Sequence, residues 1–108
     1  MALYLSRVSY TAEAWRALIN KPEDRKKAVN AMIADTGATL KELWYAFGDY
    51  DAYALIEAPD NATAASVALA VASSGAFSRF ETTPLLSMEE TIEALKKAKA
   101  VAYRPPGG

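Results

Sequence analysis

The 108-residue chain has a net charge of −1, with 52% hydrophobic and 23% charged residues. This length and composition are typical of one globular domain, and the weak charge argues against nucleic acid as a partner, because phosphate binding needs clustered Lys and Arg. Cysteine and histidine are absent, which excludes disulfides, thiolate or histidine metal sites and Ser-His-Asp catalysis within one chain.

The beginning of the sequence, 1–7, lacks the basic and long apolar regions of a signal peptide. No apolar run approaches the ~20 residues that span a bilayer. The expectation is therefore a cytoplasmic protein without a membrane partner, and the residues indicate neither a cofactor nor a metal site.

The first predicted element is a strand over 2–10, followed by a short helix that Thr11 caps and Asn20-Lys21-Pro22 interrupts. Proline is favoured in a first helical turn, so a second helix is expected from about 22 to 36. Gly37 then supplies a left-handed C-terminal cap.

Two aromatic-rich strands are expected next, at about 38–47 and 50–58, joined by Gly48-Asp49. This pair predicts a hairpin with a type II′ turn, in which Gly48 takes a positive φ angle. In the later strand, small and large side chains alternate: Ala52, Ala54, Ile56 and Ala58 fall on one face, and Asp51, Tyr53, Leu55 and Glu57 on the other.

An alanine-rich helix is expected over about 61–74, followed by a strand near 76–83 that Pro84 ends or confines to a sheet edge. A capping box at Ser87–Glu90 begins the last helix, which is expected to reach about Ala102. Its apolar residues, Ile92, Leu95 and Ala98, are predicted to face inward.

The element order β-α-β-β-α-β-α predicts an α+β, ferredoxin-like domain over 1–102, with residues 103–108 as an extended tail. Right-handed crossovers place both main helices on one face of a four-stranded antiparallel sheet, and the first and third strands are central. The small side chains of the third strand are expected to meet the alanine-rich helix.

The opposite sheet face has nothing in this chain to cover it. It presents the face of Tyr53, next to Tyr4 or Leu5 and to Trp44 or Tyr45, since the strand registers are open at this point. A patch this apolar is usually covered by a partner. We expect a second copy of the chain to cover it, and another protein is the alternative.

The segment Phe47-Gly48-Asp49-Tyr50-Asp51, followed by Ile56-Glu57-Ala58-Pro59-Asp60, resembles the GYD domain family, whose signature falls here on Gly48, Tyr50 and Asp51. The resemblance extends over nearly the whole chain. It implies a small bacterial protein of the dimeric α/β-barrel type. It implies no established activity, and no catalytic residue is carried over.

The candidate binding residues are Trp44, Tyr50, Asp51 and Tyr53, with Asp51 the best catalytic candidate. Each also has a structural explanation: the aromatic residues can pack in an interface, and Asp51 can accept backbone N–H groups at the turn. Three hypotheses follow: a homo-oligomeric module binding a small apolar or aromatic molecule, a cofactor-independent isomerase or oxygenase using Asp51 with a tyrosine, or a protein-interaction domain. Whether the chain is an enzyme, and what its ligand is, stay open.

Overall fold

A computed structural model describes all residues, 1–108, and has the predicted α+β, ferredoxin-like fold. The elements are β1 (Ala2–Tyr10), α1 (Ala12–Asn20), α2 (Arg25–Ile33), the 3-10 helix η1 (Ala34–Thr36), β2 (Thr39–Tyr45), β3 (Ala52–Ala58), α3 (Asn61–Ala72), β4 (Phe77–Leu85) and α4 (Met88–Ala98). The sheet order is β2-β3-β1-β4 with every neighbour antiparallel, so β1 and β3 are central as predicted.

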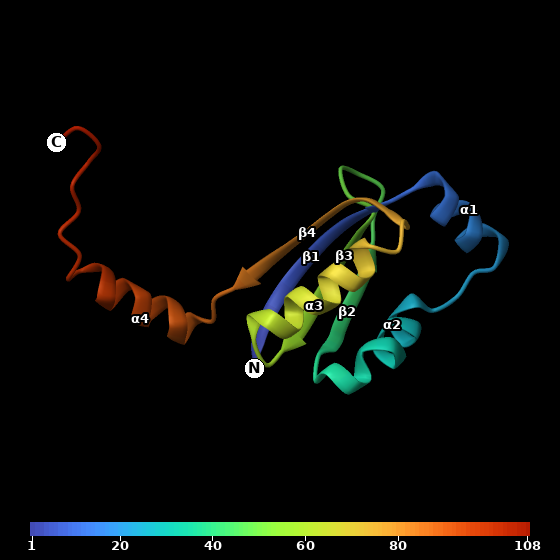
Figure 1. Cartoon of the computed structure of the whole chain (residues 1–108), viewed down its shortest axis with the longest axis horizontal. Helices are drawn as coiled ribbons and strands as arrows, with labels where there is room; N and C mark the ends of the chain where they lie inside the picture. Colours follow the sequence, from blue (N-terminus) through green and yellow to red (C-terminus); the bar gives the residue numbers. More distant parts are fainter.

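Helices α2 and α3 lie on one face of the sheet, and no helix covers the other face (Figure 1). Beneath the helices, Ala52, Ile56 and Ala58 of β3 are buried, which confirms the predicted orientation of this strand. The register pairs Leu5 with Leu55, and Trp44 with Tyr53. Leu5 and Trp44 therefore belong to the uncovered face, while Tyr4 is buried on the helix side.

The hydrophobic core is small and lies toward the end of the sheet where β1 begins. Eight buried residues form it: Tyr4, Ile33, Ala38, Leu40, Ile56, Ala58, Ala64 and Val67. The Tyr4 hydroxyl donates to Asn61 Oδ1 at 2.6 Å, which satisfies a polar group that would otherwise be costly to bury. Only 11 of the 108 residues are buried, and several large hydrophobic side chains are exposed.

The connection from β2 to β3 differs from the predicted two-residue turn. It spans residues 46–51, and Gly48 has no positive φ angle. The Ala46 N–H donates to the Asp51 carbonyl at 2.8 Å and closes this wider loop. Gly48 and Asp49 therefore do not form the predicted type II′ turn. Gly37, in contrast, has φ 87° and confirms the predicted left-handed cap.

Three boundaries also differ from the sequence-based expectation. Helix α2 begins at Arg25, later than the expected start near residue 22, and Asp24 caps it with a carboxylate that accepts the Lys27 N–H at 3.2 Å. Strand β4 continues through Pro84 to Leu85. The proline nitrogen has no proton to donate, but β4 is an edge strand and needs no donor on its outer side. Helix α4 ends at Ala98, before the expected Ala102.

Helix α4 does not face inward, contrary to the prediction. Its capping box is present, but Met88, Ile92 and Leu95 are 73%, 48% and 66% exposed. Figure 1 shows α4 standing away from the sheet beyond the end of β4. The radius of gyration is accordingly 17.4 Å, against about 13 Å for a compact domain of this length. No helix of the chain is both long and apolar enough to cross a membrane.

The two glycines predicted to need positive φ angles form a matched pair for a stability test. Gly37→Ala should lower the free energy of unfolding by about 1–2 kcal/mol, because a Cβ is strained in the left-handed region. Gly48→Ala should change it by less than about 0.5 kcal/mol, since φ there is ordinary and no atom lies within 4 Å of an added Cβ. Urea unfolding of both variants measures the difference, and equal losses would contradict the turn geometry.

Candidate functional site

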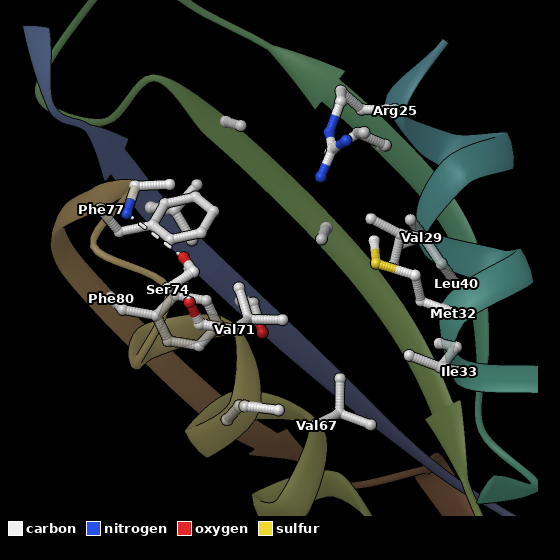
Figure 2. A pocket seen from close by; sticks show the side chains of 18 of the residues that line it. Arg25, Val29, Met32, Ile33, Leu40, Val67, Val71, Ser74, Phe77 and Phe80 are labelled. Carbon is white, nitrogen blue, oxygen red and sulfur yellow. Dashed lines mark hydrogen bonds between the residues drawn. The ribbon is translucent and has the colours of Figure 1, made fainter. Parts of the chain in front are cut away.

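A cavity of about 800 Å³ lies between α2 and α3, above the centre of the sheet. Figure 2 shows Val67, Val71 and Phe80 on one wall, with Val29 and Met32 on the other. Of the 30 lining residues, 22 are hydrophobic, so its surface suits an apolar molecule. Its volume is within the range of roughly 300–1,000 Å³ found for small-molecule pockets.

Small side chains on the central strands form the floor of this cavity. Ser6, Ala52 and Ala54 all line it, and the Ser6 hydroxyl is satisfied by the Thr82 hydroxyl at 2.9 Å. Helix α2 packs on β2, and α3 packs on β3 and β4. Because the two helices lie toward opposite edges of the same sheet face, the middle of that face stays open.

One end of the cavity is polar. Tyr10 and Arg25 line it there, and Figure 2 shows the Arg25 side chain reaching into it. The Arg25 guanidinium donates to Glu23 at 2.6 Å, and the Tyr10 hydroxyl lies 3.1 Å from that of Tyr45. Burial, followed by the contact with Tyr45, raises the pKa of Tyr10 far above its ordinary value. Tyr10 therefore stays protonated at physiological pH and can donate a hydrogen bond.

Asp51 ties the hairpin loop to β1 and α1. Its Oδ2 accepts the Tyr10 N–H at 2.9 Å and the Trp15 Nε1–H at 3.2 Å. Its own N–H donates to the Val8 carbonyl at 2.8 Å. The ring of Tyr10 contacts those of Trp15 and Phe77, each at 5.0 Å between centroids. Asp51 thus supports the aromatic residues at the polar end of the cavity.

Tyr50 belongs to a different, charged cluster on the uncovered face. The guanidiniums of Arg7 and Arg79 lie 4.7 and 4.3 Å from its ring centre, which is cation–π distance. Arg7 also pairs with Glu81 at 2.5 Å. The hydrogen bond from the Tyr50 hydroxyl lowers the pKa of Glu81, and the same bond raises the pKa of Tyr50.

The four residues predicted as a site are therefore divided between the two sides of the sheet. Trp44, Tyr50 and Tyr53 lie toward the uncovered face, where Tyr50 and Tyr53 meet edge to face at 6.2 Å. Asp51 instead directs its carboxylate to Trp15. Neither Trp44 nor Tyr53 lines the cavity.

The residues that do border the cavity were not singled out from sequence. Arg25 falls in the helix expected from about 22 to 36, and Tyr10 ends the strand expected over 2–10, so neither pattern indicates a site. The sequence feature that could have indicated the cavity is the run of small residues on β3, because small side chains leave space where the covering helices diverge. No group of three or more acidic side chains is placed to hold a metal ion.

The strand order and the position of the helices define an α+β domain of the ferredoxin-like class, and solved structures share this fold. FFRP-DM1 is 14% identical with a TM-score of 0.52, covering 80% of this chain and 100% of its own. TTHA0845 from Thermus thermophilus is 19% identical with a TM-score of 0.54, covering 81% and 95%. MtbAldR is 15% identical with a TM-score of 0.57, covering 80% of this chain and 52% of its own, so the chain spans about half the length of MtbAldR.

The chain belongs to the GYD domain family, whose profile matches residues 4–95. This confirms the resemblance inferred from Gly48, Tyr50 and Asp51. A search of curated proteins finds no significant match. At these identities the solved structures establish the fold, and any function has to be argued from the chain's own residues.

Asp51 provides a stability prediction. Asp51→Ala should lower the free energy of unfolding by about 2–4 kcal/mol, because it leaves two N–H groups without their charged acceptor. Asp51→Asn should cost roughly half as much, since the amide oxygen can still accept. Thermal or urea unfolding measures both, and a neutral Asp51→Ala would show that these bonds do not hold the loop.

Proposed function

We propose that this domain is a homo-oligomeric module that binds a small, largely apolar molecule. The cavity between α2 and α3 carries the proposal, because its volume and its 22 hydrophobic lining residues fit such a molecule. The sequence-based hypothesis has Trp44 and Tyr53 among the binding residues, and both lie toward the uncovered face. The proposed site is instead on the helix side, and the uncovered face serves assembly.

The polar end of the cavity narrows the class of ligand. Tyr10 and Arg25 both offer hydrogen-bond donors there, and Arg25 adds a positive charge that Glu23 partly balances. A molecule with an apolar or aromatic body and one carbonyl or anionic end complements this arrangement. The apolar body would lie over Ala52 and Ala54.

The uncovered face supports association of two copies. Leu3, Leu5, Trp44, Tyr53 and Leu55 form its apolar part, and Trp44 is 51% exposed. A patch that spans three neighbouring strands is costly to leave in water. Face-to-face stacking of two sheets about a two-fold axis would bury it in both copies.

The structure offers less support for the enzyme hypothesis. A general base needs an oxygen within reach of its substrate, whereas Oδ2 of Asp51 holds two N–H groups of the protein itself. Tyr10 stays protonated because its pKa is raised, so it suits binding better than proton abstraction. We therefore propose binding as the function.

Filling the cavity tests the binding proposal. The probe is 1-anilinonaphthalene-8-sulfonate, an aromatic anion of the proposed class, followed by its fluorescence. Ala54→Leu adds volume to the cavity floor and should weaken dye binding about tenfold or more. Ala65→Leu is the matched control, because Ala65 is exposed on α3 and does not line the cavity.

Equal affinity of the native chain and Ala54→Leu would place the dye elsewhere and remove support for the cavity as a ligand site. Far-UV circular dichroism and melting temperature are recorded for both variants. Loss of binding in a variant that melts like the native chain supports the proposal.

The interface between sheets is tested separately. Leu55→Lys places a charge in the middle of the uncovered face and should separate stacked copies, because an unpaired buried charge costs several kcal/mol. Leu69→Lys is the control, since Leu69 is 72% exposed on α3. Sedimentation velocity measures the assembly size, and an unchanged size in Leu55→Lys would exclude this interface.

A further inference from the structure

Helix α4 has an apolar side without a partner. Met88, Ile92 and Leu95 recur at the spacing of one helix face, and all three are exposed. The helix start is well defined, because Ser87 and Glu90 cap each other's backbone N–H groups. An isolated helix of 11 residues is only marginally stable in water, so packing of this face is needed to hold it.

The chain's own body does not supply that packing. Strand β4 carries the helix past the end of the sheet (Figure 1), and no residue of α4 is buried. The cavity mouth is on the helix-covered face, beside α2, where Met32 is 63% exposed. The apolar helix face and the open mouth thus belong to one chain but do not meet within it.

The charges at the two ends of these surfaces are complementary. Helix α4 has Glu89 and Glu90 in its first turn and Lys96 and Lys97 in its last. At the mouth, Lys21 and Arg25 line the end where α2 begins, together with Glu23, which pairs with Arg25. Acidic residues follow at the other end: Asp35 directly after α2, and Asp60 as the cap of α3. If α4 lies parallel to α2, its acidic start meets Arg25 and its basic end meets Asp35.

The lengths also agree. The 11 residues of α4 extend for about 16 Å, and the 12 residues from Arg25 to Thr36 for about 18 Å. We propose that α4 of one copy lies across the cavity mouth of another copy, with Ile92 and Leu95 facing inward. The occupant of the mouth is therefore a second copy of this chain, because the chain itself carries both complementary surfaces.

This inference rests on the proposed function in two respects: the ligand in the covered cavity and the stacking of two copies through their uncovered faces. In a stacked pair, the cavities face away from the sheet interface. The arms therefore link one pair to another. Each ligand site is completed by a helix from a different chain.

Matched double variants of the full chain test the arm. Ile92→Gln with Leu95→Gln makes the apolar face polar, whereas Glu93→Gln with Ala94→Gln changes the outer face. All four positions keep residues of adequate helix propensity. Sedimentation velocity should show the first variant reduced to the stacked pair and the second at the size of the native assembly. Equal sizes for both variants and the native chain would overturn the proposal.

Cross-linking locates the contact, because the chain has no cysteine of its own. Chains with Leu95→Cys are mixed with chains carrying Met32→Cys under mild oxidation, and a mixed disulfide is expected. The control mixture pairs Leu95→Cys with Trp44→Cys on the uncovered face. Faster cross-linking in the control mixture would place α4 on the sheet and overturn the proposal.

The outcomes separate this inference from the proposed function. If Leu55→Lys leaves the assembly unchanged while Leu95 and Met32 cross-link, the sheet interface fails and the arm contact stands. If the dye does not bind while that cross-link forms, only the ligand proposal fails. If the cross-link is missing and Ala54→Leu still weakens dye binding, only the arm contact fails.

Discussion

The pleat of β3 is the constraint on which the rest of the structure depends. Because successive side chains point to opposite faces, Ala52 and Ala54 form the cavity floor while Tyr53 and Leu55 form part of the uncovered face. A shift of one residue in register would exchange the two surfaces. The cavity and the uncovered apolar face are thus two consequences of one alternation.

Asp51 stabilises the end of the hairpin loop, directly before β3 and its alternating side chains begin. Its bonds to Tyr10 and Trp15 join the hairpin loop to β1 and α1, and its N–H meets the Val8 carbonyl just before β3 begins. Two of the three signature residues have a structural explanation: Asp51 fixes the loop on the helix side, and the ring of Tyr50 contacts two arginines on the other side. The signature therefore marks a junction between the two faces.

The fold could be predicted because its determinants are local. The period of two in β3, the cap at Gly37 and the box at Ser87 act within a few residues, and each is present. The site could not be predicted, because it depends on how far α2 and α3 diverge, which no local pattern encodes. The predicted position of α4 was wrong for a related reason. The spacing of Ile92 and Leu95 indicates an apolar helix face, but periodicity does not say what packs against that face.

The small core gives these surfaces a thermodynamic consequence. Each apolar group left in water forgoes roughly 25 cal/mol per Å², and only 11 residues of this chain are buried. Anything that binds the folded form alone, whether a ligand above Ala54 or a second copy over Trp44, adds its own free energy to folding. If the proposed ligand and the proposed second copy bind only the folded form, the stability of the domain depends on the occupancy of the cavity and on the protein concentration, and binding, assembly and folding are then linked equilibria.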